Sequence, residues 1–456
     1  MQIERNKYLN EIISKEKNGL IKVITGLRRS GKSYLLNKLF KSHLLGKGIL
    51  ESQIISFAFD NQEDIYGLNK YLIDEPTLIY DSRGNYKVNS NKFFLYIKDL
   101  TIENKQYYLL LDEIQFLDNF VITLNGFLNH DNFDVYVTGS NSKMLSKDII
   151  TEFRGRGDQI HMHPLSFKEF YNASKLSFDE AYLAYQYLGG TPAILNKSSD
   201  AEKMKYLNEL FSEIYIKDMI ERNGIKDIDS FERLLSVLAS SIGSYTNPSN
   251  LEKTFKSKEH ITYDHETIKY HIDCIKDAFL LSEAKRYNIK GKKYIGANSK
   301  FYFTDIGLRN ALINFRQNEP THIMENIIYN DLIQKGYSVD VGIVEINEKN
   351  EGGNYVTKQI ETDFVCNKLT ERIYIQSAYS METLEKLIQE KRPLINIKDN
   401  FKKIIIVKDS IKQYITEEGI YVISLKEWLL NDDEHFIWLY IMCDWRIWIW
   451  NLMKLF

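Results

Sequence analysis

The stretch LIKVITGLRRSGKSYLLNKLF, residues 20–40, places an apolar strand, a glycine-bounded loop and a helical pattern in immediate succession. Gly26, Gly31, Lys32 and Ser33 match the spacing G-x-x-x-x-G-K-[ST] of a phosphate-binding loop. The glycines let the backbone turn tightly and close its N–H groups around phosphate oxygens. Lysine supplies charge for the β and γ phosphates, and a serine hydroxyl suits Mg²⁺. The alternative is a glycine-rich turn without a ligand, but the flanking strand and helix favour the phosphate loop.

A second apolar run, QYYLLLDEIQFL at 106–117, ends in Asp112 and Glu113. A run that is apolar on both faces is typical of a central parallel strand, whose carboxyl end is where ligands bind. We therefore predict that Asp112 helps to hold Mg²⁺ and that Glu113 polarises the attacking water. Two acids at a strand end are common on their own, and their pairing with the upstream loop favours the functional interpretation.

Two further segments carry candidate site residues. DVYVTGSNSKML, 134–145, is a strand followed by small polar residues, so Thr138, Ser140 or Asn141 are candidates to contact the γ-phosphate or the water. The alternative is a plain turn in which serine or asparagine caps a helix. In EFRGRGDQI, Arg154 and Arg156 flank a glycine, and an arginine near a transferring phosphoryl group neutralises charge. The alternative is a pair of solvated loop arginines.

Length and composition set the class of protein. A chain of 456 residues is too long for one hydrophobic core, so two or three domains are expected. The formal net charge of −3 argues against a strongly basic nucleic-acid coat protein. Three cysteines, odd in number and far apart, favour neither a metal cluster nor disulfides and predict a reducing, cytoplasmic setting. The charged N-terminus predicts no secretory signal.

The pattern also predicts the surrounding elements. We expect a short helix at 4–17, a strand at 54–60, and helices and loops packed on the sheet over about 61–95. Residues 165–225 alternate apolar and charged residues at helical spacing, which predicts a helical lid behind the nucleotide.

RRSGKS, LLLDEIQ, VTGSNSKML, RGR and HPLSFKEF together resemble the ATPase domain of prokaryotic AAA+-related proteins whose C-terminal domain has an uncharacterised function and resembles restriction endonucleases. The resemblance continues through YLGGTPAIL, EIYIKDMIERNGI, FYFTDIGLRNAL and MENIIYNDLIQKGYSVDVG, and spans residues 1 to about 430. It implies an extra strand between the loop strand and the strand that bears the acids. It also implies adenine as the base, since the loop itself reads only phosphates.

The resemblance assigns roles to the residues already selected. Lys32 and Ser33 bind nucleotide and Mg²⁺, Asp112 and Glu113 form the Walker B pair, 138–141 is sensor-like, and Arg156 is the arginine finger. If Arg156 acts on a neighbouring copy, the active form is an oligomer. The predicted nucleotide contacts are Gly26, Arg28, Arg29, Ser30, Gly31, Lys32, Ser33, Tyr34, Ser140 and Asn141.

Residues 228–305 predict helices followed by a hairpin with a basic turn, which looks like a winged helix. DHETIKYHIDCIKDAF, 264–279, is the clearest helix, with Asp264 as its N-cap. A winged helix contacts DNA or joins proteins, and the acids on the third helix favour an interdomain or protein-binding wing. The residues that would contact DNA are Lys269, His271, Lys276, Lys290, Lys292 and Lys293.

The third domain, at 320–430, has the predicted order helix, strand, acid-bearing strand, strand, helix, with Glu325, Asp363 and Gln376 in nuclease-like positions. Restriction-like nucleases add a lysine two residues after the last position, which here is Ala378. One carboxylate is replaced by an amide and the lysine is absent, so we predict a degenerate site without robust cleavage. A lysine from a neighbouring strand is the alternative source of charge.

The tail, HFIWLYIMCDWRIWIWNLMKLF, is rich in tryptophan, but charged residues interrupt its apolar runs and a transmembrane span is not expected. It would lie at a membrane interface, dock on a partner, or represent an altered reading frame. The predicted parts are an AAA+-like α/β core with a parallel sheet at 1–165, a helical lid at 166–227, a winged-helix-like connector at 228–319, a restriction-endonuclease-like α/β domain at 320–430 and the tail at 431–456.

The sequence thus predicts a Mg²⁺-dependent ATPase whose nucleotide state controls its C-terminal domains. One alternative is a nucleotide-gated switch or scaffold with little turnover, which would have less need of Glu113. The other is an ATP-driven DNA-processing factor, for which salt-dependent duplex binding is the test. The physiological protein partner is not indicated.

Overall fold

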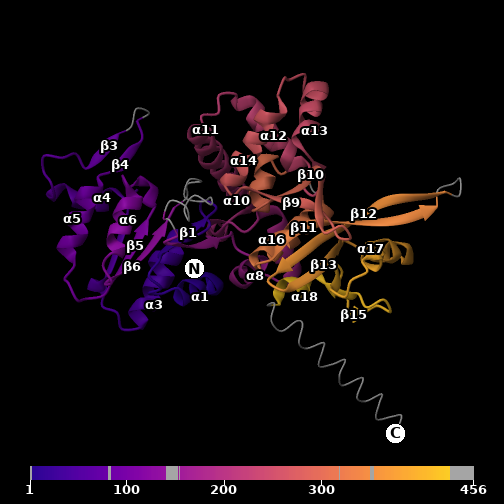
Figure 1. Cartoon of the computed structure of the whole chain (residues 1–456), viewed down its shortest axis with the longest axis horizontal. Helices are drawn as coiled ribbons and strands as arrows, with labels where there is room; N and C mark the ends of the chain where they lie inside the picture. Colours follow the sequence, from indigo (N-terminus) through magenta and orange to yellow (C-terminus); the bar gives the residue numbers. More distant parts are fainter. Residues whose placement is uncertain are drawn as a thin grey trace, which may run out of the picture. The chain divides into compact units, whose positions relative to one another are not determined.

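The computed structural model describes residues 3–80, 84–139, 153, 155–317, 319–349 and 354–431. The chain forms two compact units (Figure 1). The first unit comprises Met1–Pro164, Thr191–Asn196 and Asp277–Leu280. The second unit comprises Leu165–Gly190, Lys197–Lys276 and Leu281–Phe456.

The first unit is built on a five-stranded sheet with the order β2-β5-β6-β1-β7, and every pair of neighbouring strands is parallel. Its elements are α1 (Asn6–Ser14), β1 (Ile21–Gly26), α2 (Lys32–Tyr34), the π-helix η1 (Leu35–Phe40), α3 (Lys41–Gly46), η2 (Glu51–Gln53), β2 (Ile54–Ala58), α4 (Gln62–Gly67), η3 (Leu68–Lys70), β3 (Leu78–Tyr80), β4 (Tyr86–Val88), α5 (Ser90–Leu100), β5 (Tyr107–Asp112), η4 (Ile114–Phe116), α6 (Phe120–Leu128), β6 (Phe133–Thr138), β7 (Gly157–Met162) and η6 (Pro192–Asn196).

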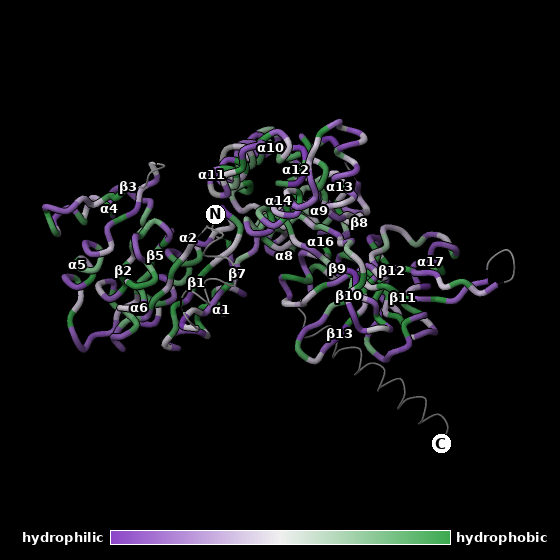
Figure 2. The backbone as a smooth tube through the Cα atoms, turned by 45° about the horizontal axis from the view of Figure 1, so that its top comes forward, coloured by the Kyte–Doolittle hydropathy of each residue, from purple (hydrophilic) through white to green (hydrophobic). Residues whose placement is uncertain are grey.

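Helices cover both faces of this sheet, because successive side chains of each strand point to opposite faces. Leu109 and Leu111 of β5 pack in one core with residues of α5 and α6. Tyr108 and Leu110 of the same strand pack in a second core with residues of α1, η1 and α3. Both faces of β5 are buried, and hydrophobic colouring appears in this part of the sheet in Figure 2. This burial explains why the strand reads as a continuous apolar run.

Most predicted elements of the first unit are confirmed. The strands expected at the loop, at 54–60, before Asp112 and at 134 are β1, β2, β5 and β6, and the expected N-terminal helix is α1. β6 lies between β1 and β5, which confirms the extra strand. The segment 61–95 differs from expectation, because it also contains a short antiparallel hairpin of β3 and β4. Strands this short are held by main-chain hydrogen bonds between them, and they are too short to give a recognisable periodic pattern of apolar residues in the sequence.

The second unit combines helices with a nine-stranded mixed sheet of order β15-β16-β14-β13-β12-β11-β9-β10-β8. Its elements are α8 (Phe167–Ser174), α9 (Phe178–Leu188), α10 (Asp200–Glu209), the π-helix η7 (Leu210–Ile216), α11 (Lys217–Asn223), α12 (Ile228–Ser240), β8 (Tyr245–Thr246), α13 (Pro248–Thr254), η8 (Phe255–Glu259), α14 (His265–Asp277), β9 (Leu281–Asn288), β10 (Lys293–Phe303), α15 (Ile306–Leu312), α16 (Pro320–Gln334), β11 (Ser338–Lys349), β12 (Tyr355–Lys368), β13 (Glu371–Ala378), α17 (Leu384–Asn396), β14 (Lys402–Val407), β15 (Tyr414–Ile415), β16 (Tyr421–Ser424) and α18 (Leu425–Leu430).

Several sequence predictions are confirmed in the second unit. Asp264 Oδ1 accepts hydrogen bonds from the backbone N–H groups of Glu266 and Thr267, so it caps α14 as expected. Ile268, Ile272 and Ile275 of this helix are buried. β9 and β10 form the expected hairpin, in which Lys293 at the start of β10 pairs with Asn288 at the end of β9. The order helix, strand, acid-bearing strand, strand, helix is realised as α16, β11, β12, β13 and α17.

Candidate functional site

The loop between β1 and α2 has the backbone conformation that its glycines predict. Gly26 has φ 136° and Gly31 has φ 99°, both in the region where a side chain is unfavourable. A Cβ atom on Gly26 would lie 2.0 Å from the carbonyl oxygen of Met162 on β7. Glycine is therefore required at Gly26 by close backbone packing as well as by conformation.

Lys32 is buried immediately after this loop, with 5% of its surface exposed. Its Nζ donates hydrogen bonds to the carbonyl oxygens of Gly26 at 3.0 Å and Leu27 at 3.1 Å. The pKa of Lys32 is lowered to about 8, chiefly by burial and with a smaller contribution from the charge of Arg28, whereas Glu113 and Asp112 act in the opposite direction. The ammonium group is thus held against the loop backbone, close to the acids that end β5.

Asp112 and Glu113 lie at the carboxyl end of β5, as predicted. Burial raises the pKa of Asp112, and hydrogen bonds from Thr138 and Ser33 oppose this rise. Thr138, at the end of β6, donates its hydroxyl proton to Asp112 Oδ1 and accepts from the backbone N–H of Glu113 at 3.2 Å. Glu113 itself has a left-handed backbone, φ 52°, and accepts from Gln115 Nε2.

These two hydrogen bonds give Thr138 a role different from the phosphate contact predicted for it. Thr138 is fully buried, and its hydroxyl holds the Asp112 carboxylate and the backbone of Glu113. The pairing of β5 with β6 brings Thr138 beside the two acids, and the sequence of neither strand predicts this pairing. Ser140, Asn141 and Arg154 lie outside the described residues.

A third carboxylate, to which the sequence analysis assigned no role, lies at the same carboxyl end of the sheet. Asp60 follows β2, and Ala58 pairs with Asp112 across the two strands. Desolvation raises the pKa of Asp60, as do the charges of Glu113 and Asp112. The signal was an acid at a strand end, but only the strand order shows that β2 neighbours β5.

The N-terminal helix also supports the loop. Arg5, which is 2% exposed, donates from Nη1 to Ser30 O at 3.2 Å and from Nη2 to His163 O at 2.6 Å. His161, on β7, shares a hydrogen bond of 3.2 Å between its Nδ1 and Thr25 Oγ1. Burial lowers the pKa of His161 to about 4, and the charge of Lys32 contributes. A neutral His161 on β7 thus bonds to the end of β1, and Arg5, which immediately precedes α1, bonds to the loop at Ser30.

Arg156 lies away from this edge of the sheet. Its carbonyl oxygen accepts from Ile21 N at the start of β1, whereas the phosphate loop follows Gly26 at the end of β1. Six residues at about 3.3 Å per residue place the two ends of the strand roughly 16 Å apart. Arg156 is exposed, and the structure does not bring it together with Lys32, Asp112 and Glu113.

These residues fit a magnesium nucleotide. A glycine-bounded loop with left-handed turns, a buried ammonium group and a helical stretch that starts at Lys32 together suit a polyphosphate. Ser33 and Asp112 share a hydrogen bond and supply the oxygen atoms that Mg²⁺ prefers. Of the predicted loop contacts, Ser30 is buried, Arg28 and Tyr34 are half-buried, and Arg29 and Ser33 are exposed.

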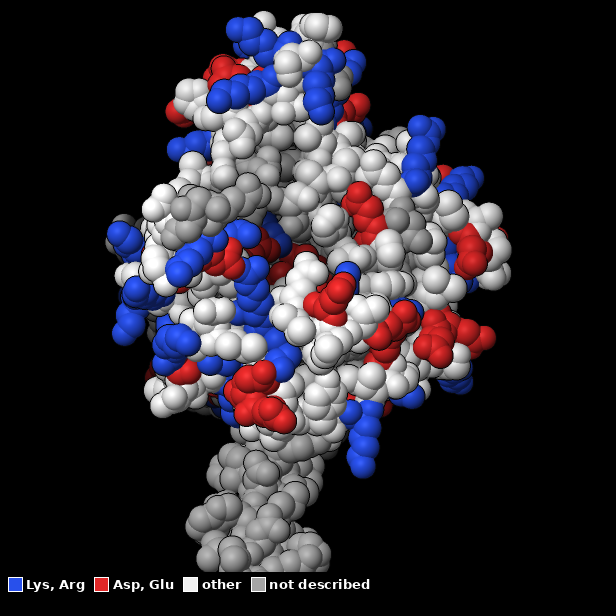
Figure 3. Space-filling view, turned by 90° about the vertical axis from the view of Figure 1, so that its right-hand side faces the viewer, with Lys and Arg blue, Asp and Glu red and all other residues white. Residues whose placement is uncertain are grey.

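Of the residues predicted to contact DNA in the second unit, two are engaged with other side chains of the unit and four are exposed. His271 is buried and its Nδ1 meets the Tyr263 hydroxyl, while Lys276 Nζ lies 2.8 Å from Glu283. Both side chains are therefore engaged within the unit. Both charge signs appear on the face in Figure 3, so that face is not dominated by lysine and arginine. The predicted contacts that are exposed are Lys269, Lys290, Lys292 and Lys293.

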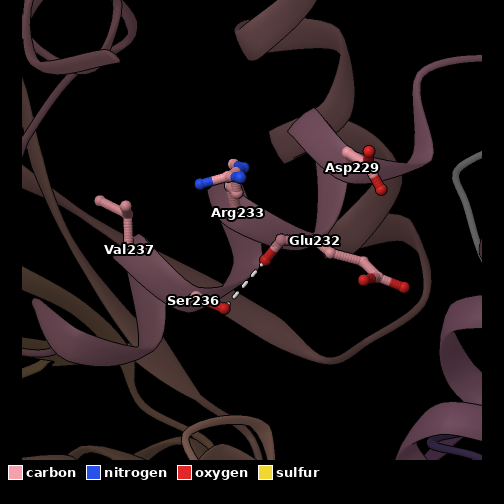
Figure 4. A pocket seen from close by; sticks show the side chains of 5 residues that line it. All are labelled: Asp229, Glu232, Arg233, Ser236 and Val237. Carbon is pink, nitrogen blue, oxygen red and sulfur yellow. Dashed lines mark hydrogen bonds between the residues drawn. The ribbon is translucent and has the colours of Figure 1, made fainter. Parts of the chain in front are cut away.

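A hollow along α12 is lined by side chains one or two turns apart on a single helix (Figure 4). Ser236 Oγ donates to the backbone oxygen of Glu232 at 3.0 Å, so this hydroxyl is used within the helix. The side chains that line this hollow are two acids, a base, a hydroxyl and an apolar side chain: Asp229, Glu232, Arg233, Ser236 and Val237.

The nuclease-like residues converge in the second unit. Asp363 N donates to Gln376 Oε1 at 3.4 Å, and the charge of Glu325 acts on Asp363.

Among the described residues, no helix is long and apolar enough to cross a membrane. The predicted tail lies outside them from residue 432 onward. Cys274 and Cys366 are buried free thiols.

Comparison with known proteins agrees with the loop geometry. Residues 18–171 match a family described as an AAA domain, and residues 179–319 match a domain family of unknown function, DUF8612. An uncharacterized protein of Haemophilus influenzae is 33% identical over 435 residues, which cover 94% of this chain and 99% of that protein. The uncharacterized protein MJ1544 of Methanocaldococcus jannaschii is 28% identical, covering 90% and 88% respectively.

Among solved structures, the ORC2 protein of Aeropyrum pernix is 12% identical over 72% of this chain and 92% of that one. The TM-score of this match is 0.34. The full-length match and the AAA domain, which contains the loop and both acids of β5, establish the relationship. The chain belongs to the family of AAA-domain P-loop proteins that includes this Haemophilus influenzae protein.

Proposed function

We propose that this protein binds ATP with Mg²⁺ and hydrolyses it, and that the bound nucleotide controls the second unit. The observation that carries the proposal is the meeting of Lys32, Asp112 and Glu113 at one edge of the sheet. Lys32 is a buried cation that burial partly destabilises, so a polyphosphate beside it would restore its charge. This complementarity supports phosphate binding over a simple glycine turn.

The chain's own groups suit each part of hydrolysis. Lys32 and the backbone N–H groups of the loop would hold the phosphates, while Ser33 and Asp112 would hold the metal. When bound, Mg²⁺ would neutralise charge on the β and γ phosphates. Glu113, fixed by the bond from its N–H to Thr138 and by Gln115, would accept a proton from the attacking water.

The direct test is steady-state release of phosphate from ATP by the full-length protein, with Mg²⁺ and with excess chelator. Turnover that requires the metal supports the proposal. Nucleotide binding without turnover would instead favour the alternative of a nucleotide-gated switch or scaffold. GTP in place of ATP measures the base preference, which rests on the family resemblance alone.

Nucleotide affinity is expected to fall as the pH rises above about 8. The pKa of Lys32 is lowered to about 8 in the free protein, and bound phosphate favours the ammonium form. The full affinity is therefore present below pH 8, and at pH 9 only about one tenth of the free protein carries the charge, which weakens binding roughly tenfold. Titration calorimetry in buffers of different ionisation enthalpy should also detect proton uptake at pH 9. Lys32→Arg, whose guanidinium stays charged, is the matched control and should show no such dependence; equal affinity of the wild type at pH 7 and 9 contradicts the prediction.

Arg156, if it is an arginine finger, must act on another copy of the chain, because it lies at the opposite end of β1 from the phosphate loop. Arg156→Ala is then expected to lower turnover by about tenfold or more. Mixing this variant with Lys32→Ala should give more turnover than the two variants measured separately, since each supplies what the other lacks.

The exposed Arg316, in the second unit, provides a matched control, and Arg316→Ala should leave turnover unchanged. A mixture whose turnover equals the sum of its parts would show that Arg156 does not act between copies. A homo-oligomeric active form is therefore part of this proposal.

The remaining assignments within the second unit are also proposals. The order α12, β8, α13, α14, β9, β10, with β8 paired to β10, supports a winged helix. The order α16 to α17 and the convergence of Glu325, Asp363 and Gln376 support a restriction-endonuclease-like part. The engagement of His271 and Lys276 within the unit supports a wing that contacts protein. Salt-dependent binding of duplex DNA would favour the ATP-driven DNA-processing alternative.

A further inference from the structure

A buried lysine lies among the acids of the nuclease-like part. Lys300 Nζ, on β10, is 2.9 Å from Glu325 Oε1 on α16 and 2.6 Å from Glu361 Oε1 on β12. The exposed fraction of the Lys300 side chain is 6%, and that of Glu325 is 8%. Asp363, two residues after Glu361 on the same strand, also acts on Lys300 through its charge. One ammonium group therefore faces three carboxyl groups from two elements.

Two ion pairs, to Glu325 and Glu361, satisfy the buried Lys300 ammonium group. Burial lowers the pKa of Lys300, but the charges of Glu325, Asp363 and Glu361 outweigh it and raise this pKa above its usual value. Burial raises the pKa of Asp363, and so does the charge of Glu325, while Lys300 lowers it. The ammonium group is the positive charge that compensates this cluster.

One oxygen atom of each of the two predicted metal-binding carboxylates, Glu325 and Asp363, already accepts hydrogen bonds from protein donors. Glu325 Oε1 accepts from the Tyr302 hydroxyl at 2.5 Å as well as from Lys300. Asp363 Oδ2 accepts from the backbone N–H of Ser377 at 2.7 Å. Gln376, at the last position of the predicted metal site, has its amide oxygen toward Asp363 N and its amide nitrogen toward Glu390.

The predicted metal site therefore does not fit a divalent cation. We infer that the Lys300 ammonium group takes the place of the metal, so that this cluster is a metal-independent ion-pair network joining β10, α16 and β12. A divalent cation would have to enter beside a fixed positive charge and displace hydrogen bonds that the fold already makes. Lys300 comes from β10 and reaches Glu361 and Glu325 directly, so it neutralises the acids instead of standing beside a bound metal.

Lys300→Ala should turn the cluster into a divalent cation site. The experiment uses the full-length chain without nucleotide and in an Asp112→Asn background, which removes the acid of the proposed nucleotide-linked metal site. Mn²⁺ serves as the probe, and the melting temperature is measured with and without it. Mn²⁺ should raise the melting temperature of Lys300→Ala by about 5 °C or more at saturating concentration, since it binds only the folded state. The background protein should show no shift.

Two further variants locate the effect. Adding Asp363→Asn to Lys300→Ala should abolish the shift, because one of the acids is then neutral. Lys276→Ala removes another paired lysine of the same unit, 2.8 Å from Glu283 and 3.2 Å from Asp273, and should gain no response to Mn²⁺. If Lys300→Ala does not fold without Mn²⁺, the inference requires that Mn²⁺ restore its folded circular dichroism spectrum.

Two results would overturn the inference. The first is a Mn²⁺ shift in the background protein that Asp363→Asn removes, because the metal would then bind beside Lys300. The second is Lys300→Ala that neither responds to Mn²⁺ nor is restored by it. Failure of ATP hydrolysis would leave these readouts unchanged, so the two proposals are tested separately.

Discussion

Lys32→Ala is expected to abolish ATP binding, and Glu113→Gln to keep binding while turnover falls by roughly 10² to 10³-fold. Lys32 is the buried cation nearest the loop carbonyl oxygens, so alanine removes the charge that would hold the phosphates. Glutamine retains the shape of Glu113 and its contact with Gln115 but cannot accept a proton, and general-base contributions are typically about 10² to 10⁴-fold. Equilibrium binding of a fluorescent ATP analogue and phosphate release separate the two steps.

Gln115→Ala provides a control for position in this experiment. It removes a donor to Glu113 and leaves the carboxylate in place, so turnover should fall less than in Glu113→Gln. Glu113→Gln with undiminished turnover would show that Glu113 is not the base. Lys32→Ala with normal binding would remove the phosphate loop from the proposed function.

Asp134→Ala is expected to destabilise the first unit by about 3 to 5 kcal/mol, because it leaves a charge buried without its partner. Lys22 on β1 is fully buried and forms an ion pair with Asp134 on the neighbouring β6. Burial lowers the pKa of Lys22, and Asp134 opposes that change. Asp134 Oδ2 also accepts from the Tyr136 hydroxyl at 2.8 Å and from Lys17 N at 3.0 Å. Urea unfolding followed by circular dichroism measures the loss.

Two variants distinguish the buried charge from the loss of a contact. Lys22→Met combined with Asp134→Asn removes both charges, retains an oxygen at residue 134, and should recover most of the lost stability. Glu51→Ala breaks a more exposed pair, 2.7 Å from Lys41, and should cost no more than about 1 kcal/mol. Equal losses for Asp134→Ala and Glu51→Ala would contradict the prediction.

The two motifs around Lys32 and Asp112 could be predicted because each is contiguous in the chain. A tight loop needs glycine at its ends, and an acid at the end of a buried strand reaches the same edge as the loop. Family resemblance supplied the strand between them, which periodicity does not encode. Hydrophobic patterning also predicted α14 and its N-cap, since both depend on neighbours within a few residues.

Long-range pairs escaped prediction for the opposite reason. Thr138 is linked to Asp112 by the pairing of β5 and β6, and Asp60 joins the same edge through β2. Arg5, immediately before α1, bonds to the loop at Ser30. Nothing in the spacing of these residues relates them, because strand order, and not distance along the chain, decides which side chains meet.

The glycine loop motif, the two acids of β5 and the succession of elements could be predicted from the sequence, because they depend on local backbone conformation and on which faces are apolar. The position of Arg156 at the opposite end of β1 from the loop depends on strand packing, since β7 runs parallel to β1 and begins beside Ile21. The tertiary structure also decided that Lys300, and not the residue at position 378, brings the positive charge to Glu325 and Glu361. A buried charge needs a partner within a few ångströms, and only the folded chain brings one from a distant strand.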